Sequence, residues 1–415
     1  MSSLCLYKLS EIIKNNISSK YKDLDLVNIT FGHKTKNLYI SAFNLAKKLY
    51  NNNNNSLLKY GTEYIEYVPN DYEIQNLCIS SIIKNNNSYQ VVKNYIIDIN
   101  YIDPSLELRK NELLRLSFFS TKPFLISIND NIMMIIIFTI KDNTYIFESE
   151  IDFNNDTSLL LKNQKFYNKH FNKKLIPYND NGKINFITEA HPFTIIKNDK
   201  IEEHPCNLIE DIISSYKYNI CYINEKFQND GYLTNFSLET PPIDFIYDNI
   251  VCKLGILQLQ IDRSNFYFDI ENKKYKLKRD NSLSNLIKSI EYTICDRSLS
   301  SLISNEYELF INNKIIIDKF LNLMIFIIID SEMNIIKVSS AFMLNYPYFN
   351  SISNKCISLN INKENNIVLI SIEENKGYSR LLEINSNDVR NMLIFDGESF
   401  SGHDINFSQV KPTVL

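Results

Sequence analysis

The feature that most constrains this chain is a recurring pair of apolar strand patterns joined by a short polar turn. The triplets NDN and KDN separate three apolar segments, which predicts one antiparallel meander over Phe124–Ile128, Ile132–Ile140 and Thr144–Ile151. The same pattern recurs towards the C-terminus without a fixed period, so the sequence does not indicate a repeat protein. The strands predicted there are Val251–Ile261, Phe266–Ile270, Lys274–Lys278, Leu323–Asp330, Asn334–Ser340, Ile367–Glu373 and Tyr378–Ile384.

Two of these segments are unusually apolar. They are NIMMIIIFTI, which starts at Asn131, and FLNLMIFIIID, which starts at Phe320. Each is roughly half as long as the ~20 residues that a membrane-spanning helix needs. We therefore expect buried strands here, and no membrane partner.

Helical periodicity is clearest in five other segments. They are Leu4–Ile17, Glu73–Lys84, Pro104–Phe119, Asn207–Tyr216 and Ser282–Thr293. Together with the strands they predict an α+β fold, mixed and strand-rich, with antiparallel meanders and several amphipathic helices. A chain of 415 residues exceeds one ordinary domain, and Pro241-Pro242 is its clearest break. We predict an N-terminal α/β region over 1–150 that ends in a β-meander, a loop-rich middle region over 151–240 and a strand-rich region over 241–415.

The composition indicates a folded chain without a general attraction to nucleic acid. Hydrophobic residues make up 44% of the sequence, and the net charge is −4. The seven cysteines are scattered and never form a C-x-x-C pair, which is typical of reduced, buried thiols. The first twenty residues lack the pattern of a secretion signal. Lys, Asn, Ile and Tyr have A/T-rich codons, so part of the tyrosine and asparagine content reflects genome bias.

One segment carries four residues of the types that bind zinc. These are His191, His204, Cys206 and Cys221. Their spacing matches no zinc template, and each histidine precedes a proline, which favours extended loops. We therefore predict no metal site, and an enzyme built around these four residues remains the third alternative.

Other catalytic patterns are weak. The stretch FDGESFSGHD, from Phe395 to Asp404, gathers Asp396, Glu398, His403 and Asp404 around two glycines. Such a loop could do acid–base or metal chemistry, but a polar turn near the end of the chain is the simpler interpretation. Phosphate-binding glycine loops and hydrolase or kinase motifs are absent, and the chain has only eight glycines. We predict no enzymatic activity, no catalytic residue and no cofactor.

Two basic stretches favour an alternative function. Lys162–Lys174 alternates lysines with Phe166, Tyr167 and Phe171, and Lys273–Arg279 is a second patch on a predicted hairpin. Aromatic rings can stack on bases while lysines meet phosphates. The alternative is therefore a viral nucleic-acid-associated protein, such as a processivity or transcription factor. A strand with a solvated basic face is the competing interpretation.

The tyrosines favour self-association instead. The stretch LYNNNNNSLLKYGTEYIEYVPNDYE, residues 49–73, places Tyr60, Tyr64, Tyr67 and Tyr72 after five asparagines. Tyrosine gives a rigid contact area and a polar tip, and amides add donors and acceptors. We predict that these four tyrosines make contacts between identical chains.

In its A/T-rich, Trp-free and Tyr-rich character across the whole length, the chain resembles the occlusion-body proteins of insect viruses, nearest the polyhedrin-like proteins of nudiviruses. No short family motif matches, so no functional residue carries over. The resemblance implies a structural matrix protein that crystallises around virions in the host-cell nucleus and dissolves at alkaline pH. Its partners would be identical chains and the enclosed virions, with no specific nucleic acid. Near pH 10.5, half-ionised lysines and tyrosines would take the net charge to about −40, so identical chains would repel.

Overall fold

The computed structural model describes most of the chain, including all the strands discussed below. The described residues are 5–35, 37–48, 72–86, 88–141, 143–154, 158–170, 174–190, 192–204, 233–262, 266–269, 274–277, 320–339, 342–344, 355–374, 378–393, 395–396, 408–410 and 413–414. They divide into two compact units. Unit 1 comprises Met1–Tyr7, Lys173–Lys376 and Arg380–Leu415, and unit 2 comprises Lys8–Asn172 and Gly377–Ser379.

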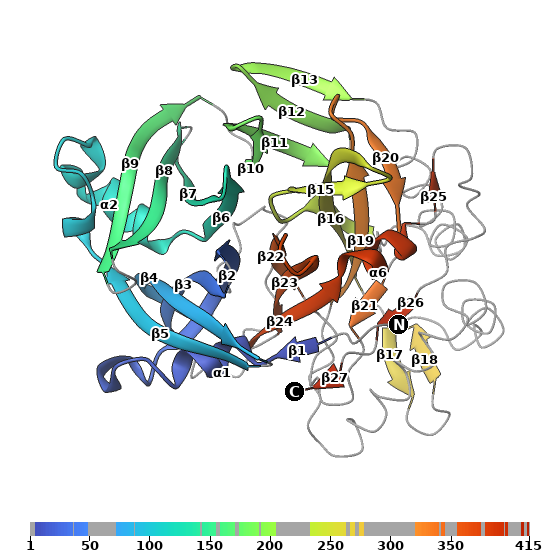
Figure 1. The fold of residues 1–415 in the computed structure, drawn as a ribbon, viewed down its shortest axis with the longest axis horizontal. Coiled ribbons are helices and arrows are strands. Elements are labelled where there is room, and N and C mark those ends of the chain that lie inside the picture. The colour runs from blue at the N-terminus through green and yellow to red at the C-terminus, as the bar shows by residue number, and fades with distance from the viewer. Residues whose placement is uncertain are drawn as a thin grey trace. The chain divides into compact units, whose positions relative to one another are not determined.

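Antiparallel sheets dominate (Figure 1), and the fold class is a strand-rich, five-bladed β-propeller. The predicted α+β class is therefore wrong. Unit 2 holds two four-stranded blades. The first has the order β2 (Asp25–Thr35), β3 (Leu38–Lys48), β4 (Tyr72–Asn85), β5 (Ser88–Ile97), and the second has β6 (Pro123–Ile128), β7 (Asn131–Ile140), β8 (Asn143–Asn154), β9 (Ser158–Lys169).

Unit 1 holds the other three blades. The third blade is β10 (Ile176–Asp180), β11 (Lys183–Ala190), β12 (Phe193–Lys197) and β13 (Lys200–His204). In the fourth, β16 (Ile250–Asp262) pairs with β14 (Leu233–Leu238), β15 (Ile243–Tyr247) and β19 (Phe320–Ile329). Beyond β19 lie β20 (Ile335–Val338), β25 (Phe395–Asp396), β21 (Phe342–Leu344) and β26 (Ser408–Val410), while β17 (Phe266–Asp269) and β18 (Lys274–Leu277) form a separate hairpin.

The fifth blade joins the two ends of the described chain. Its order is β22 (Lys355–Asn362), β23 (Ile367–Glu374), β24 (Tyr378–Asn385), β1 (Cys5–Tyr7) and β27 (Thr413–Val414). Strand β1 runs antiparallel to β24 (Figure 1), and the Tyr7 hydroxyl donates to Glu383 Oε2 at 3.3 Å. The N-terminal strand thus completes a sheet built from C-terminal residues.

Asparagine and aspartate make the tight turns of this glycine-poor chain. A two-residue hairpin loop of type I′ needs positive φ at both central residues, and after Gly the residues Asn and Asp tolerate this conformation best. Among the described residues, eight Asn and three Asp account for eleven of the thirteen non-glycine residues with positive φ. Four such loops are complete in the structure: Asn129-Asp130, Asn181-Gly182, Asn198-Asp199 and Asp248-Asn249.

At two predicted helices the structure differs from the prediction, and each difference has a physical reason. The segment Glu73–Lys84 lies within strand β4, whose central residues are buried on both faces and so lack the alternation of a half-exposed strand. The segment Pro104–Phe119 forms a short 3-10 turn and then helix α2 (Glu112–Ser120), which begins at Asn111 because the Asn111 carboxamide accepts the Leu114 N–H.

The other helix predictions have mixed outcomes. The segment Leu4–Ile17 contains strand β1 and the short helix α1 (Leu9–Lys14). The C-terminal part holds helix α6 (Ser386–Met392), which the sequence did not predict. The predictions for Asn207–Tyr216 and Ser282–Thr293 lie outside the described residues.

All the predicted strands are confirmed as strands to within a few residues. The two very apolar segments are β7 and β19, which are central strands with buried side chains where these are described. No helix in the described ranges has the length and apolar character to cross a lipid bilayer.

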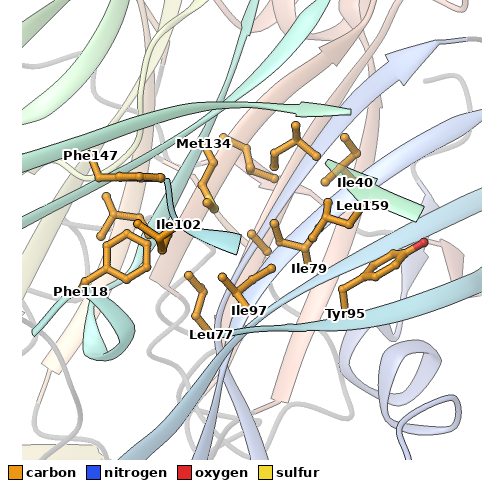
Figure 2. Close-up of a cluster of buried hydrophobic side chains, with 14 of the residues drawn as sticks. Ile40, Leu77, Ile79, Tyr95, Ile97, Ile102, Phe118, Met134, Phe147 and Leu159 are labelled. Carbon is orange, nitrogen blue, oxygen red and sulfur yellow. The ribbon is translucent and has the colours of Figure 1, made fainter. Parts of the chain in front are cut away.

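Each unit has its own apolar core. In unit 2 the faces of the two blades meet around Ile40, Leu77, Ile79, Met134 and Phe147, as Figure 2 shows. Helix α2 contributes Phe118, whose ring lies edge-on to Phe147 at 5.0 Å. In unit 1 the corresponding core lies between the fourth and fifth blades and includes Leu254, Ile256, Phe326, Leu359 and Ile370.

Candidate functional site

The most site-like group of described residues is a buried carboxylate held by two lysines in unit 1. Glu239 directly follows β14, and its side chain is only 9% exposed. The Lys174 ammonium lies 2.7 Å from Glu239 Oε1, and the Ser237 hydroxyl donates to the same oxygen at 2.6 Å. The Lys355 ammonium lies 3.6 Å from Oε2. We call Lys174, Ser237, Glu239 and Lys355 the Glu239 centre.

The Glu239 centre connects three blades of unit 1. Lys174 lies two residues before β10 of the third blade, Glu239 belongs to the fourth blade, and Lys355 is the first residue of β22 in the fifth. Across the strand pair, Lys355 faces Glu373 of β23, which is also buried. The centre therefore consists of side chains that are far apart in the sequence, at the start of two strands and the end of a third.

The electrostatics favour an ionised Glu239. Burial raises the pKa of this carboxyl, but the charges of Lys174 and Lys355 and the hydrogen bonds from Lys174 and Ser237 outweigh it and hold the pKa well below its usual range. Burial lowers the pKa of Lys355, whose side chain is 16% exposed, although Glu239 and Glu373 oppose that effect. Lys174 is 51% exposed and forms the solvent-facing side of the centre.

Two buried polar atoms beside the centre have no hydrogen-bond partner. Gln258 of β16 lies directly opposite Ser237 in the strand register, and its Oε1 is one of them. The other is the hydroxyl of Thr240, the residue next to Glu239. Both side chains are more than nine-tenths buried. Buried polar atoms normally have partners, so these two atoms can take hydrogen bonds from a bound molecule, either a ligand or a water.

Unit 1 has a second polar cluster whose groups are mutually satisfied. The Asn179 amide donates to Asp244 at 3.2 Å, and the Lys253 ammonium lies 2.9 Å from the same carboxylate. This cluster joins β10 to the β15–β16 hairpin. Its short cross-links indicate a structural role.

Unit 2 has a carboxylate between two lysines that serves as a useful comparison. Asp152 of β8 lies 2.6 Å from the ammonium groups of both Lys34 and Lys162. These contacts link β2 of the first blade to β8 and β9 of the second. Asp152 is more exposed than Glu239, and the same charge pattern links the two blades of unit 2 there.

The basic stretch Lys162–Lys174 is mostly strand β9, and its groups have local roles. Lys162 pairs with Asp152, Lys165 lies opposite Glu148, and Lys174 belongs to the Glu239 centre. Phe166 packs against the unit 2 core, and the Tyr167 hydroxyl donates to Glu148. Both rings are partly buried, and Phe171 lies outside the described residues, so the nucleic-acid alternative stays a prediction. Of Lys273–Arg279, only the backbone of β18 is described.

The zinc-type residues are not brought together in the described part of the chain. His204 ends β13, and its Nε2 is buried without a hydrogen-bond partner. His191, Cys206 and Cys221 lie outside the described residues. In the described ranges no three metal-binding side chains cluster. Of Phe395–Asp404, only the two residues of β25 are described.

The predicted contact tyrosines remain a prediction. Tyr60, Tyr64 and Tyr67 lie outside the described residues. Tyr72 begins β4, where its backbone pairs with Lys48 of β3.

Sequence reasoning did not single out Glu239. The one local sign is its position, because an acidic residue directly follows a strand and precedes Thr240 and the Pro241-Pro242 pair. The sequence places Lys174 in a basic patch and indicates no role for Lys355. Nothing in the sequence links residues 174, 239 and 355 to one another.

No protein-family model matches the chain, and no curated protein matches it. Among solved structures, it is similar to MPT-1, a GDP-Man-dependent mannosyltransferase from Leishmania mexicana, at 11% identity and a TM-score of 0.38 over 95% of this chain and 98% of that one. It is also similar to MPT-4, a mannose phosphorylase from the same organism, at 8% identity and a TM-score of 0.37 over 97% of both chains. A Trypanosoma rangeli sialidase matches at 9% identity and a TM-score of 0.35 over 90% of this chain and 46% of that one.

These structures are enzymes, and the prediction that this chain has no enzymatic activity is corrected on that finding. At these identities and TM-scores the likeness carries neither a reaction nor a substrate over to this chain.

Proposed function

We propose that this protein binds a small polar ligand at the Glu239 centre. The observation that supports this is the combination of a buried, ionised carboxylate with two buried polar atoms, Gln258 Oε1 and Thr240 Oγ1, that have no protein partner. A buried polar atom without a partner costs about 1–3 kcal/mol, and a bound ligand can supply the missing hydrogen bonds. Lys174 is half-exposed and gives the ligand a charged group on the solvent side.

The test is a ligand screen by saturation-transfer NMR on the full-length chain. Separate samples contain monosaccharides, amino acids and carboxylic acids, and inorganic phosphate is followed by ³¹P line broadening. We expect at least one class to bind the wild type and to lose affinity in Gln258→Leu. Asp152→Asn is the matched control, because it removes a carboxylate from between two lysines away from the centre. Absence of binding in every class, or equal binding by wild type and Gln258→Leu, would refute the proposal.

A second proposal retains self-assembly into an occlusion-body matrix. One observation favours it: the tip of the β15–β16 hairpin exposes Ile246, Ile250 and Val251, with Ile250 and Val251 at 67% and 69% exposure. Adjacent exposed apolar side chains are typical of a protein-binding surface. We expect the wild type to associate as its concentration rises at neutral pH, and the double variant Ile250→Ser/Val251→Ser to remain monomeric in analytical ultracentrifugation.

The control is Val92→Ser, since Val92 is exposed on β5 of unit 2 and has no part in the hairpin. A wild-type protein that stays monomeric at high concentration would contradict the self-assembly proposal. So would association that is unchanged in the double variant.

A further inference from the structure

The charges and hydrogen-bonding groups around the Glu239 centre also select a class of ligand, if the centre binds one as proposed above. Two ammonium groups, Lys174 and Lys355, meet two carboxylates, Glu239 and Glu373. The formal charges of these four side chains cancel. A small anion would meet Glu239, which already occupies both lysines, and a small cation would meet Lys355. Neither kind of ion gains a net attraction.

The polar groups around the Glu239 centre include both hydrogen-bond donors and hydrogen-bond acceptors. Gln258 Oε1 can only accept, the Thr240 hydroxyl can do both, and the half-exposed Lys174 ammonium donates. A ligand that satisfies these groups must donate to one and accept from another within a short distance. A hydroxyl group does both, whereas phosphate ions mainly accept and ammonium ions only donate.

The position of the two orphan atoms supports the same conclusion. Gln258 lies opposite Ser237 on adjacent strands, so its side chain is on the Ser237 face of the sheet, and Thr240 follows Glu239 directly in the sequence. A ligand that donates to Gln258 Oε1 and also exchanges a hydrogen bond with the Thr240 hydroxyl is best supplied with more than one hydroxyl group. We infer that the Glu239 centre takes an uncharged, polyhydroxylated molecule, which contacts Gln258 and Thr240.

The experiment compares glycerol, mannitol and glucose with inorganic phosphate and magnesium chloride. Saturation-transfer NMR detects the polyols, ³¹P line broadening detects phosphate, and calorimetry detects magnesium. We expect at least one polyol to bind, with at least tenfold weaker binding in Gln258→Leu and in Thr240→Val. Thr240→Ser keeps the hydroxyl and should retain binding, and Asp152→Asn should leave it unchanged. Two-dimensional NMR spectra of each variant establish that it is folded.

Each outcome decides one of the two claims. If phosphate or magnesium binds and loses affinity in Gln258→Leu while no polyol binds, the ligand class is wrong and the binding site stands. If polyols bind equally well to wild type, Gln258→Leu and Thr240→Val, they bind elsewhere and this inference fails. If none of the five probes binds, this inference fails, and the wider screen under the proposed function decides whether the centre binds a ligand at all.

Discussion

Replacing Glu239 by Gln tests the physical basis of the Glu239 centre most directly. The substitution keeps the size of the side chain but removes the charge that two lysines share. Lys355 would then be buried with Glu373 as its remaining acidic neighbour among the groups that set its pKa. Breaking a buried ion pair by removing one partner typically costs about 3–5 kcal/mol, because it leaves a buried charge uncompensated. Lys174 adds less, since it is half-exposed and regains contact with water.

A double-mutant cycle separates this effect from a general loss of packing. Lys355→Met alone leaves Glu239 with Lys174 and Ser237 and should cost less than Glu239→Gln. The double variant removes both buried charges, so we expect it to be more stable than the sum of the two losses predicts, by about 2–3 kcal/mol. Urea unfolding followed by far-UV circular dichroism measures these differences, because the chain has no tryptophan to serve as a fluorescent probe.

The pH dependence gives a second measurement of the same interaction. The pKa of Glu239 is lowered in the folded chain, so its contribution to stability is present above the unfolded value near pH 4.5 and is lost as pH falls below it. The stability difference between wild type and Glu239→Gln should therefore shrink in acid. Asp152→Asn, at a more exposed carboxylate, should cost only about 1 kcal/mol. Additive losses in the cycle, or equal costs for the Glu239 and Asp152 variants, would refute this account.

Three further predictions concern unit 1. Gly255→Ala should lower the free energy of unfolding by about 1–3 kcal/mol in urea, because the new methyl group would lie 3.0 Å from a side-chain carbon of Ile327 in the packed sheet. An unchanged urea midpoint would show that the Ile327 side chain moves aside at no cost. Asn249→Val should cost about 1–2 kcal/mol and Asn249→Gly almost nothing, because φ is 63° at this position; equal thermal midpoints would contradict the role given to asparagine. Burial raises the pKa of Cys252 from 9.0 to about 11, so about 2–3 kcal/mol of stability should be lost as pH rises from 9 to 11. Cys252→Val should remove this contribution when the free energy of unfolding is measured across the same pH range.

Hairpins with local signals could be predicted from the sequence, and the propeller could not. Strands β6, β7 and β8 were found because apolar residues flank Asn-Asp and Lys-Asp turns, which fix each hairpin locally. The repeat of the blades was hidden because their lengths differ greatly: the first spans residues 25–97 and the third only 176–204. Strand β4 was mistaken for a helix because its burial on both faces removes the alternation that identifies a strand.

The Glu239 centre could not be predicted for a different reason. Its members come from three blades, and the one contact in it between residues close in the sequence is the Ser237–Glu239 hydrogen bond. Lysine and glutamate are common surface residues, so their burial is the informative property, and burial depends on how the sheets pack. The predicted contact surface beside the asparagine run depended on composition alone and not on how the sheets pack. Among the described residues, asparagine has a conformational use in turns that composition alone did not reveal.

Buried phenols change how this chain should respond to alkali. The charge of about −40 expected near pH 10.5 assumed that tyrosines ionise as they do in water. In the structure, burial raises the pKa of Tyr7, Tyr95 and Tyr178, and nearby acidic groups raise it further for Tyr7 and Tyr178. A group whose folded pKa is raised stays neutral in the fold and ionises in the unfolded chain, so stability is lost as pH rises above about 10. Strong base would then unfold the blades that hold these tyrosines as well as separate neighbouring chains. Dissolution of an assembly at alkaline pH should for this reason be accompanied by loss of β-sheet circular dichroism, whereas pure charge repulsion between folded chains would leave the β-sheet signal intact.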